Sequence, residues 1–183
     1  MNSVLLKTSL CAAFLFCLSG TIFSQDRTWT PFTPKNGEWT ILAPGSLTPD
    51  EEAQKPKSSK GSYAYVDFNG FFAVIYRDFS RWQMVSKKGQ MTKQRDTVLS
   101  ASKGSLIRDT EFTSGDISGR EVWIRMPDTR VISRESNIKP RHRVQRFRMF
   151  FKGNRLYMLL VVLPEEDINS VVVSNHLNSF KFK

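Results

Sequence analysis

The sequence predicts an α+β domain in which an antiparallel sheet of about seven strands is flanked by two helices. Three pairs of β-rich segments, each joined by a turn signal, predict three hairpins within residues 63–76, 105–127 and 143–162. One helical stretch separates the first hairpin from the others, and a second follows the last. Such grouping of strands and helices is typical of α+β proteins, and 183 residues with 40% hydrophobic and 24% charged side chains suffice for one globular domain.

Residues 1–24 have the features of a secretory signal peptide. Lys7 precedes an apolar stretch, and the small Ser24 stands before Gln25, so we expect cleavage near Ser24/Gln25. The stretch is shorter than the roughly 20 residues that a membrane-spanning helix needs. We therefore predict an exported protein, periplasmic or extracellular, with no stable membrane insertion after cleavage; a retained N-terminal anchor is the alternative. Residues 25–36 are expected to form a linker, and residues 37–183 a single domain.

Cleavage would change both the cysteine content and the charge of the chain. Cys11 and Cys17 lie inside the expected signal peptide, so the mature chain would hold no disulfide, catalytic thiol or cysteine metal site. Removing residues 1–24 also removes Lys7 and no acid, which leaves 26 basic and 17 acidic side chains and a net charge of +9. This excess favours association with anionic partners.

The first part of the domain is predicted to be a short strand, a loop and a hairpin. The strand carries Trp39 and Ile41 on one face and ends at Pro44-Gly45. The polar residues 46–62 that follow predict a loop, in which the acidic residues 50–52 are expected to be solvated rather than to bind a cation. Asn69-Gly70 then favours a type I′ turn.

A turn centred on Asn69-Gly70 fixes the register of that hairpin. It places Phe68 opposite Phe71, Val66 opposite Ala73 and Ala64 opposite Ile75. Both faces would be largely apolar, which predicts a hairpin inside a sheet that is covered on two sides.

The next segments predict a helix and a second hairpin. Apolar residues at Met91, Val98 and Leu99 suit an amphipathic helix from about Lys88 to Ser102, with Gly104 marking its end. Strands are expected at 105–115 and 119–127. In the second of these strands, alternate residues from Val122 to Met126 are expected to face the core, and the alternate set with Glu121, Trp123 and Arg125 to form the wetter face.

The last segments predict an exposed excursion, a third hairpin and a helix. Residues 128–142 are charged and without periodicity, and Pro140 interrupts them. A turn at Gly153-Asn154 then pairs Phe151 with Leu156, Met149 with Met158 and Phe147 with Leu160. A helix is expected from Pro164, with Glu165, Glu166 and Asp167 near the positive end of its dipole and a buried stripe of Ile168, Val172, Leu177 and Phe180, although the run of valines at 171–173 weakens this prediction.

Several of these segments resemble a group of exported bacterial proteins with a PsbP-like fold, named after the extrinsic protein of the photosystem II oxygen-evolving complex. The shared features are "WTILAPG", the "YAYVDFNGFFAVIYRD" hairpin, "SGREVWI", "RFRMFFKGNRLYMLLVV" and the closing "LNSFKF", over roughly residues 37–183. The resemblance implies an α/β/α sandwich around an antiparallel sheet. It also implies an accessory or binding role without shared catalytic residues: photosynthetic members tune a partner's metal cluster, and a eukaryotic branch binds a nuclear-transport GTPase.

The sequence contains no recognisable catalytic or metal-binding motif. The only histidines are His142 and His176, and neither stands in a spacing suited to a triad or a metal site. No G-x-S-x-G, H-E-x-x-H, EF-hand or phosphate-binding glycine motif occurs. We therefore predict a protein that is not an enzyme and has no cofactor; an unrecognised hydrolase or ligand-converting enzyme with a sheet-edge pocket is the alternative.

The densest basic region is the candidate binding site. Arg146 and Arg148 are expected to project together from one face of a strand that Arg143 begins. The full candidate set is Arg130, Arg134, Arg141, Arg143, Arg146 and Arg148. Arginine forks suit phosphate, sulfate and carboxylate groups. An exported protein would not ordinarily meet nucleic acid, so we expect a protein or an acidic envelope polymer as the partner; an inert solvated strand face is the alternative.

Overall fold

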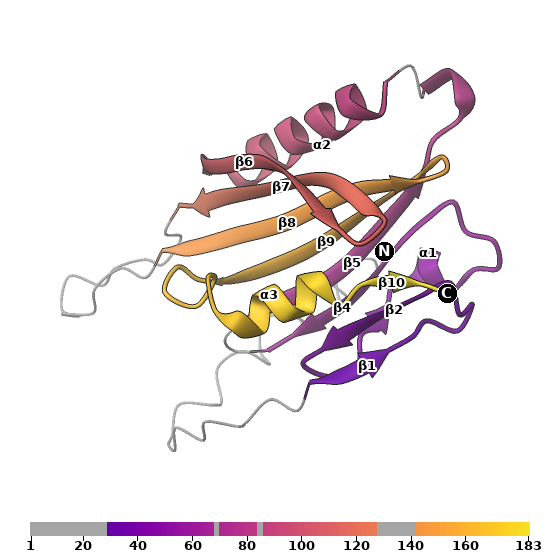
Figure 1. Ribbon diagram of the computed structural model, residues 1–183, viewed down its shortest axis with the longest axis horizontal. Coiled ribbons are helices and arrows are strands. Elements are labelled where there is room, and N and C mark those ends of the chain that lie inside the picture. The colour runs from indigo at the N-terminus through magenta and orange to yellow at the C-terminus, as the bar shows by residue number, and fades with distance from the viewer. Residues whose placement is uncertain (1–28, 68–69, 84–85, 128–141) are drawn as a thin grey trace, which may run out of the picture.

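The computed structural model describes residues 29–67, 70–83, 86–127 and 142–183, which form two antiparallel sheets with helices packed against them (Figure 1). In chain order the elements are β1 (Thr30–Phe32), β2 (Trp39–Ala43), β3 (Thr48–Pro49), α1 (Glu51–Gln54), β4 (Lys60–Val66), β5 (Phe71–Asp78), a 3-10 turn (Arg81–Gln83), α2 (Lys87–Ser102), β6 (Ser105–Ser114), β7 (Ile117–Met126), β8 (Arg143–Lys152), β9 (Arg155–Pro164), α3 (Val171–Asn178) and β10 (Lys181–Phe182).

The larger sheet has seven strands in the order β3-β4-β5-β9-β8-β7-β6, and every neighbouring pair is antiparallel. This confirms the predicted α+β class, but the membership of the sheet differs from the prediction. The first predicted strand, β2, pairs instead with β1 and β10 in a small sheet. The seventh strand is β3, which lies in the expected loop, and β1 lies in the expected linker.

The two faces of the large sheet are covered by different elements. On one face α2 packs through Met91, Val98 and Leu99 against a cluster centred on β7, β8 and β9. On the other face α3 and the small sheet enclose an aromatic core that includes Trp39, Phe72 and Phe150. Figure 1 shows α2 along β6 and β7, and α3 near the small sheet. The architecture is therefore the expected α/β/α sandwich, with the small sheet added to one layer.

The first hairpin forms, but the predicted register is wrong by two residues. Val66 lies opposite Phe71, and Ala64 lies opposite Ala73. The Asp67 N–H donates to the Gly70 carbonyl at 3.0 Å, and the Gly70 N–H donates to the Asp67 carboxylate at 2.7 Å. The aspartate therefore closes the turn one residue earlier than an Asn-Gly turn would. A shift of two residues leaves every side chain on its predicted face.

The helix predicted at 88–102 is confirmed as α2. The Ser86 hydroxyl accepts a hydrogen bond from the Gly89 N–H at its start, and Lys103 takes a left-handed conformation at its end. The next residue, Gly104, has no room for a side chain, since an added Cβ would lie 2.5 Å from the Ile124 side chain of β7. None of the helices in the described residues is long and apolar enough to cross a membrane.

The C-terminal helix begins later than predicted. Pro164 is the last residue of β9, and α3 starts only at Val171, where the Ser170 side chain caps it. Glu165 pairs with Arg125 of β7, so its charge is satisfied by that ion pair and not by a helix dipole. Ile168, Leu177 and Phe180 are buried as predicted, but Val173 is buried in place of Val172, which is 43% exposed.

Candidate functional site

The two strand arginines expected on a binding face are buried in an ion cluster, which we call the Glu121 cluster (Glu121, Arg146 and Arg148). The third hairpin has the predicted register, so both arginines leave β8 on the face opposite Phe147 and Met149. There the Glu121 carboxylate lies 3.0 Å from Arg146 Nη2 and 2.5 Å from Arg148 Nε. The three residues are at most 8% exposed. The prediction that Glu121 lies on a solvent-exposed face of β7 is therefore wrong.

The Glu121 cluster joins the sheet to the α3 layer. Arg146 donates to the Ile168 carbonyl at 3.2 Å, and Arg148 donates to the Asn178 side chain at 2.7 Å. The Trp123 indole N–H donates to Glu121 at 2.9 Å. Burial would raise the pKa of Glu121, but the hydrogen bonds from Arg148 and Trp123 and the two guanidinium charges outweigh it and lower that pKa.

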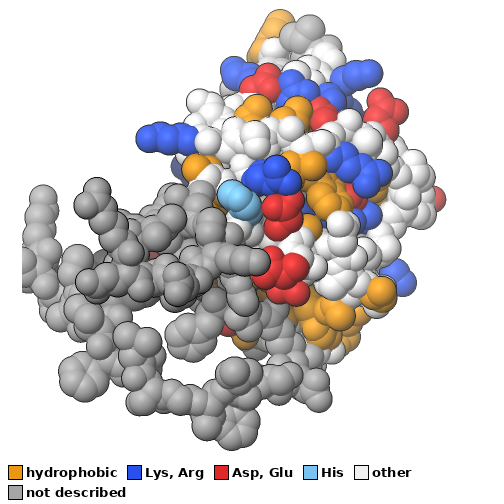
Figure 2. Space-filling model, turned by 90° about the vertical axis from the view of Figure 1, so that its left-hand side faces the viewer, with side chains coloured by type: hydrophobic (Ala, Val, Ile, Leu, Met, Phe, Trp, Pro, Cys, Tyr) orange, Lys and Arg blue, Asp and Glu red, His pale blue; other side chains and the backbone are white. Residues whose placement is uncertain are grey.

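The remaining residues of the candidate set are not brought together with this cluster. Arg143 is exposed at the start of β8, opposite Pro164 of β9. Arg130, Arg134 and Arg141 lie outside the described residues, so their role stays a prediction. On the described part of the end at which β8 begins, Figure 2 shows basic and acidic side chains close together rather than a continuous basic surface.

The two histidines lie apart from each other. His176 is fully buried, with Nδ1 hydrogen-bonded to the Leu42 carbonyl and its ring against Trp29 and Phe72. Burial lowers the pKa of His176 to about 4, so it is neutral at physiological pH. His142 is exposed before β8. Within the described residues, no three His, Cys, Asp or Glu side chains are placed to hold a metal ion.

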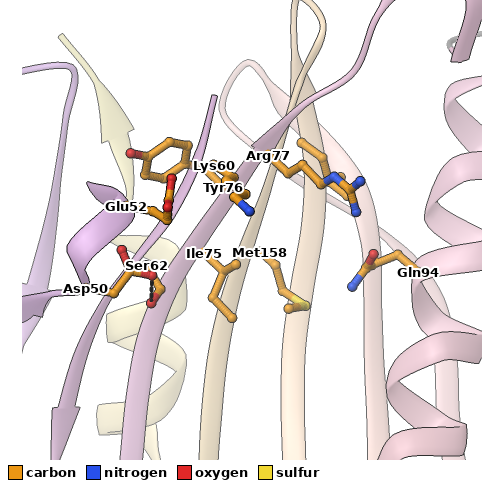
Figure 3. A pocket seen from close by; sticks show the side chains of 11 residues that line it. Asp50, Glu52, Lys60, Ser62, Ile75, Tyr76, Arg77, Gln94 and Met158 are labelled. Atoms are coloured by element: carbon orange, nitrogen blue, oxygen red, sulfur yellow. Dashed lines mark hydrogen bonds between the residues drawn. The ribbon is translucent and has the colours of Figure 1, made fainter. Parts of the chain in front are cut away.

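A groove of about 430 Å³, the α1–α2 groove, crosses the open part of the large sheet (Figure 3). Its floor contains Ile75, Leu156 and Met158 from β5 and β9. Figure 3 shows Asp50 and Glu52 on the α1 side and Gln94 reaching from α2 on the other. The rest of the lining is Lys60, Gly61, Ser62, Tyr76 and Arg77. No histidine or cysteine is among these residues.

The groove stays open because α2 is held toward the β6 edge of the sheet. Asp109 of β6 accepts from Arg95 of α2 at 2.5 Å and from Arg120 of β7 at 2.6 Å. On the other side α1 packs closely on β4: a Cβ added at Gly61 would lie 2.8 Å from Ala53. Ala53 of α1 packs against the aromatic core on the opposite face, so α1 lies at the β4 edge, and the α2-bearing face of β4, β5 and β9 stays open and lines the groove.

Two basic side chains face each other directly across the groove-bearing hairpin. Lys60 of β4 lies opposite Arg77 of β5 in the register, and both are exposed. Within the part of the chain that the structure describes, neither makes an ion pair. Like charges directly opposite on neighbouring strands destabilise a sheet. The pair is therefore an unfavourable feature for folding that lies at the rim of an apolar groove.

Sequence reasoning missed this pair because of the hairpin register. With the turn placed at Asn69-Gly70, Arg77 would have faced Ser62, and Lys60 fell in the expected loop. The Asp67 side chain, which closes the turn, is the signal that would have corrected the register. Asp50 and Glu51 are exposed, as expected for solvated acids; the expected loop is wrong here, because Asp50 caps α1 and Glu51 begins it, and Asp50 and Glu52 line the groove.

The fold agrees with the resemblance stated from the sequence. The solution structure of cyanobacterial PsbP (CyanoP) from Synechocystis sp. PCC 6803 matches with a TM-score of 0.55 at 12% sequence identity, over 91% of this chain and 99% of that one. A crystal structure from Bacteroides thetaiotaomicron VPI-5482 matches with a TM-score of 0.46 at 10% identity, over 85% of this chain and 48% of that one.

A third similar structure is the Ran-binding protein Mog1p of Saccharomyces cerevisiae, with a TM-score of 0.47 at 9% identity over 85% of this chain and 95% of that one. These last two overlays are weaker, and the conclusion rests on the first. No protein-family model and no curated protein matches the sequence. At 12% identity the likeness establishes the fold alone, and the chain has a PsbP-like fold.

Proposed function

We propose that this chain is an exported, non-catalytic binding or accessory protein whose partner is a protein segment that carries acidic and apolar side chains and lies in the α1–α2 groove. The observation that carries the proposal is the Lys60–Arg77 pair above the floor of Ile75, Leu156 and Met158. Two like charges opposite each other lower the stability of the fold. A destabilising contact of this kind is expected where the residues have a functional role, such as binding a partner.

The chemistry of the groove favours a protein partner over a reaction. The floor offers aliphatic and thioether side chains, and the rim offers two cations that make no ion pair among the described residues, although Arg77 lies 5.5 Å from the centre of the Phe79 ring. An acidic segment with apolar residues would satisfy both, with its carboxylates at Lys60 and Arg77. A hydrolase would need a nucleophile beside a base. No histidine or cysteine lines the groove, and its one hydroxyl–carboxylate contact, Ser62 to Asp50 at 2.9 Å, involves a carboxylate that already caps α1, so the described lining does not favour that alternative.

The proposal predicts opposite effects of one substitution on stability and on binding. Arg77→Glu removes the like-charge contact and places a carboxylate opposite Lys60, so we expect the free energy of unfolding to rise by about 0.2–1 kcal/mol. The same variant should lose the partner because the rim becomes acidic. Stability is measured by urea unfolding at low ionic strength.

Binding is measured by cross-linking in the native envelope, with a photoreactive residue in place of Ile75. We expect a discrete protein adduct that Arg77→Glu reduces by at least about fivefold, equivalent to roughly 1 kcal/mol of binding free energy. The matched control places the photoreactive residue at Lys93, an exposed position on α2. The same adduct from both positions, or an adduct that Arg77→Glu leaves unchanged, contradicts the proposal.

A further inference from the structure

A second hollow lies on the other side of α1 and is larger than the groove. This cavity, of about 730 Å³, is bounded by the segment after β1, by the segment after α1 and by the ends of β4 and β5. We call it the β1–α1 cavity. Its volume lies within the roughly 300–1,000 Å³ that small-molecule sites usually occupy. Tyr76 borders both hollows, but the remaining lining residues of the two are different.

The inner wall of the β1–α1 cavity is apolar and aromatic. Phe32 and Leu47 come from the small sheet and the segment after it, and Tyr63 and Tyr76 come from β4 and β5. The rings of Phe32 and Tyr63 lie 5.8 Å apart, and those of Tyr63 and Tyr76 lie 6.5 Å apart. This packing fixes the orientation of the rings, so the wall presents a preformed surface to the apolar part of a ligand.

Basic side chains gather among the other lining residues. Lys35 follows β1, Lys55 and Lys57 follow α1, and Arg155 begins β9. Arg155 is engaged by Glu38 at 2.9 Å and by Asp78 at 2.5 Å, and Lys55 pairs with Glu52 at 2.7 Å. Within the described residues, Lys35 and Lys57 have no carboxylate partner, and both are exposed. Two ammonium groups are thus available at this cavity.

Lys57 is kept in a conformation that favours glycine. Its φ is +52°, in the left-handed region, where a residue with a Cβ is less stable than glycine by roughly 1 kcal/mol. The tyrosine hydroxyls add neutral donors to the site. Burial raises the pKa of both Tyr63 and Tyr76, so the hydroxyls stay protonated; that of Tyr76 is hydrogen-bonded to Ser58, and that of Tyr63 can donate to an oxyanion.

From these contacts we infer that the β1–α1 cavity binds a small organic oxyanion, a phosphate or carboxylate attached to an apolar ring or short chain. The apolar body lies against Phe32, Leu47 and Tyr63. The oxyanion lies between Lys35 and Lys57, which suit it as point charges. This inference is separate from the groove and does not depend on its partner.

Phenyl phosphate, benzoate, inorganic phosphate and neutral benzyl alcohol are the probes for this site, titrated into the full chain by calorimetry. We expect saturable binding of phenyl phosphate or benzoate with a Kd below about 1 mM, and at least about tenfold weaker binding of inorganic phosphate and benzyl alcohol. The oxyanion that binds better identifies the charged group. Absence of saturable binding by both aryl anions overturns the inference.

A pair of double variants then locates the site. The double variant Lys35→Gln, Lys57→Gln should raise the Kd of the aryl anion about tenfold, because each exposed charge pair contributes up to about 1 kcal/mol of binding free energy. The matched control, Lys93→Gln with Lys181→Gln, removes the same charge at exposed positions outside the cavity and should leave the Kd unchanged. Equal weakening in both double variants would show nonspecific attraction to a basic protein and would overturn the inference.

Discussion

Replacing Glu121 by glutamine is expected to destabilise the protein by about 3–5 kcal/mol, the cost of leaving buried charges without their counterion. Glu121 is the only acid in contact with Arg146 and Arg148 among the described residues, and both arginines are at most 8% exposed. Glutamine keeps the shape of the side chain and can still accept hydrogen bonds, but it removes the charge. The loss is measured as a shift of the urea unfolding midpoint, followed by circular dichroism.

The control for this prediction is the exposed ion pair between Arg125 and Glu165. Their side chains are 45% and 37% exposed, so Glu165→Gln should cost at most about 1 kcal/mol. If Glu121→Gln is as mild as Glu165→Gln, the Glu121 cluster is hydrated rather than buried, and the arginines would again be candidates for binding a partner.

A simultaneous replacement separates the charge from the packing. In Glu121→Met, Arg146→Met and Arg148→Leu, no buried charge remains, and apolar side chains fill a similar volume. We expect this triple variant to recover most of the stability that Glu121→Gln loses. The triple variant would lack the hydrogen bonds to Ile168 and Asn178 and the acceptor for the Trp123 indole N–H, and these losses account for the stability that it does not recover.

The Glu121 cluster also shows how far the sequence could predict this fold. Alternation and turn signals predict β2 and the six strands of the three hairpins, but not the short β1, β3 and β10, and the Gly153-Asn154 turn fixes the third hairpin correctly. Alternation assigns side chains to a face, but it does not say what covers that face. Alternation places Arg146 and Arg148 on the correct face but predicts them exposed, because nothing local indicates that α3 lies above them and that Glu121 supplies their counterion from β7.

The groove and the cavity could not be predicted for a related reason. Both are formed where segments distant in sequence meet: α1 and α2 flank the groove, and the segments after β1 and α1 border the cavity. The residues that form α1 were expected to be a loop, since a four-residue helix is too short to show periodicity. The Lys60–Arg77 pair needed a register that only the Asp67 hydrogen bonds define.

His176 leads to the second large prediction, a loss of stability in mildly acidic solution. Its Nδ1 is hydrogen-bonded to the Leu42 carbonyl, and its Nε2 is buried without a hydrogen-bond partner among the residues that the structure describes. The neutral ring with the proton on Nδ1 satisfies this arrangement. A proton added to Nε2 would place a positive charge between the rings of Trp29 and Phe72, with no hydrogen-bond acceptor for it in the described part of the chain.

The direction of the pH effect follows from the two pKa values. The pKa of His176 is about 4 in the folded protein and about 6.5 in an unfolded chain. Well above pH 6.5, His176 is neutral in both the folded and the unfolded state, so it does not contribute to the pH dependence of the unfolding free energy. As the pH falls from 6.5 toward 4, only the unfolded state binds the proton, and stability decreases. We expect a loss of about 2 kcal/mol between pH 7 and pH 5, and roughly 3 kcal/mol by pH 4.

His176→Asn tests this assignment, because an asparagine amide can still donate to the Leu42 carbonyl but does not titrate. The variant will be less stable at pH 7, since it fills less of the core, but its unfolding free energy should be nearly constant between pH 7 and pH 5. Carboxylates with lowered pKa, such as those of Asp109 and Glu121, lose their contribution only at lower pH and do not obscure this window. The matched control, His142→Asn, replaces the exposed histidine and should keep the wild-type slope. A wild-type slope in His176→Asn as well would mean that a different group binds the proton when the protein unfolds.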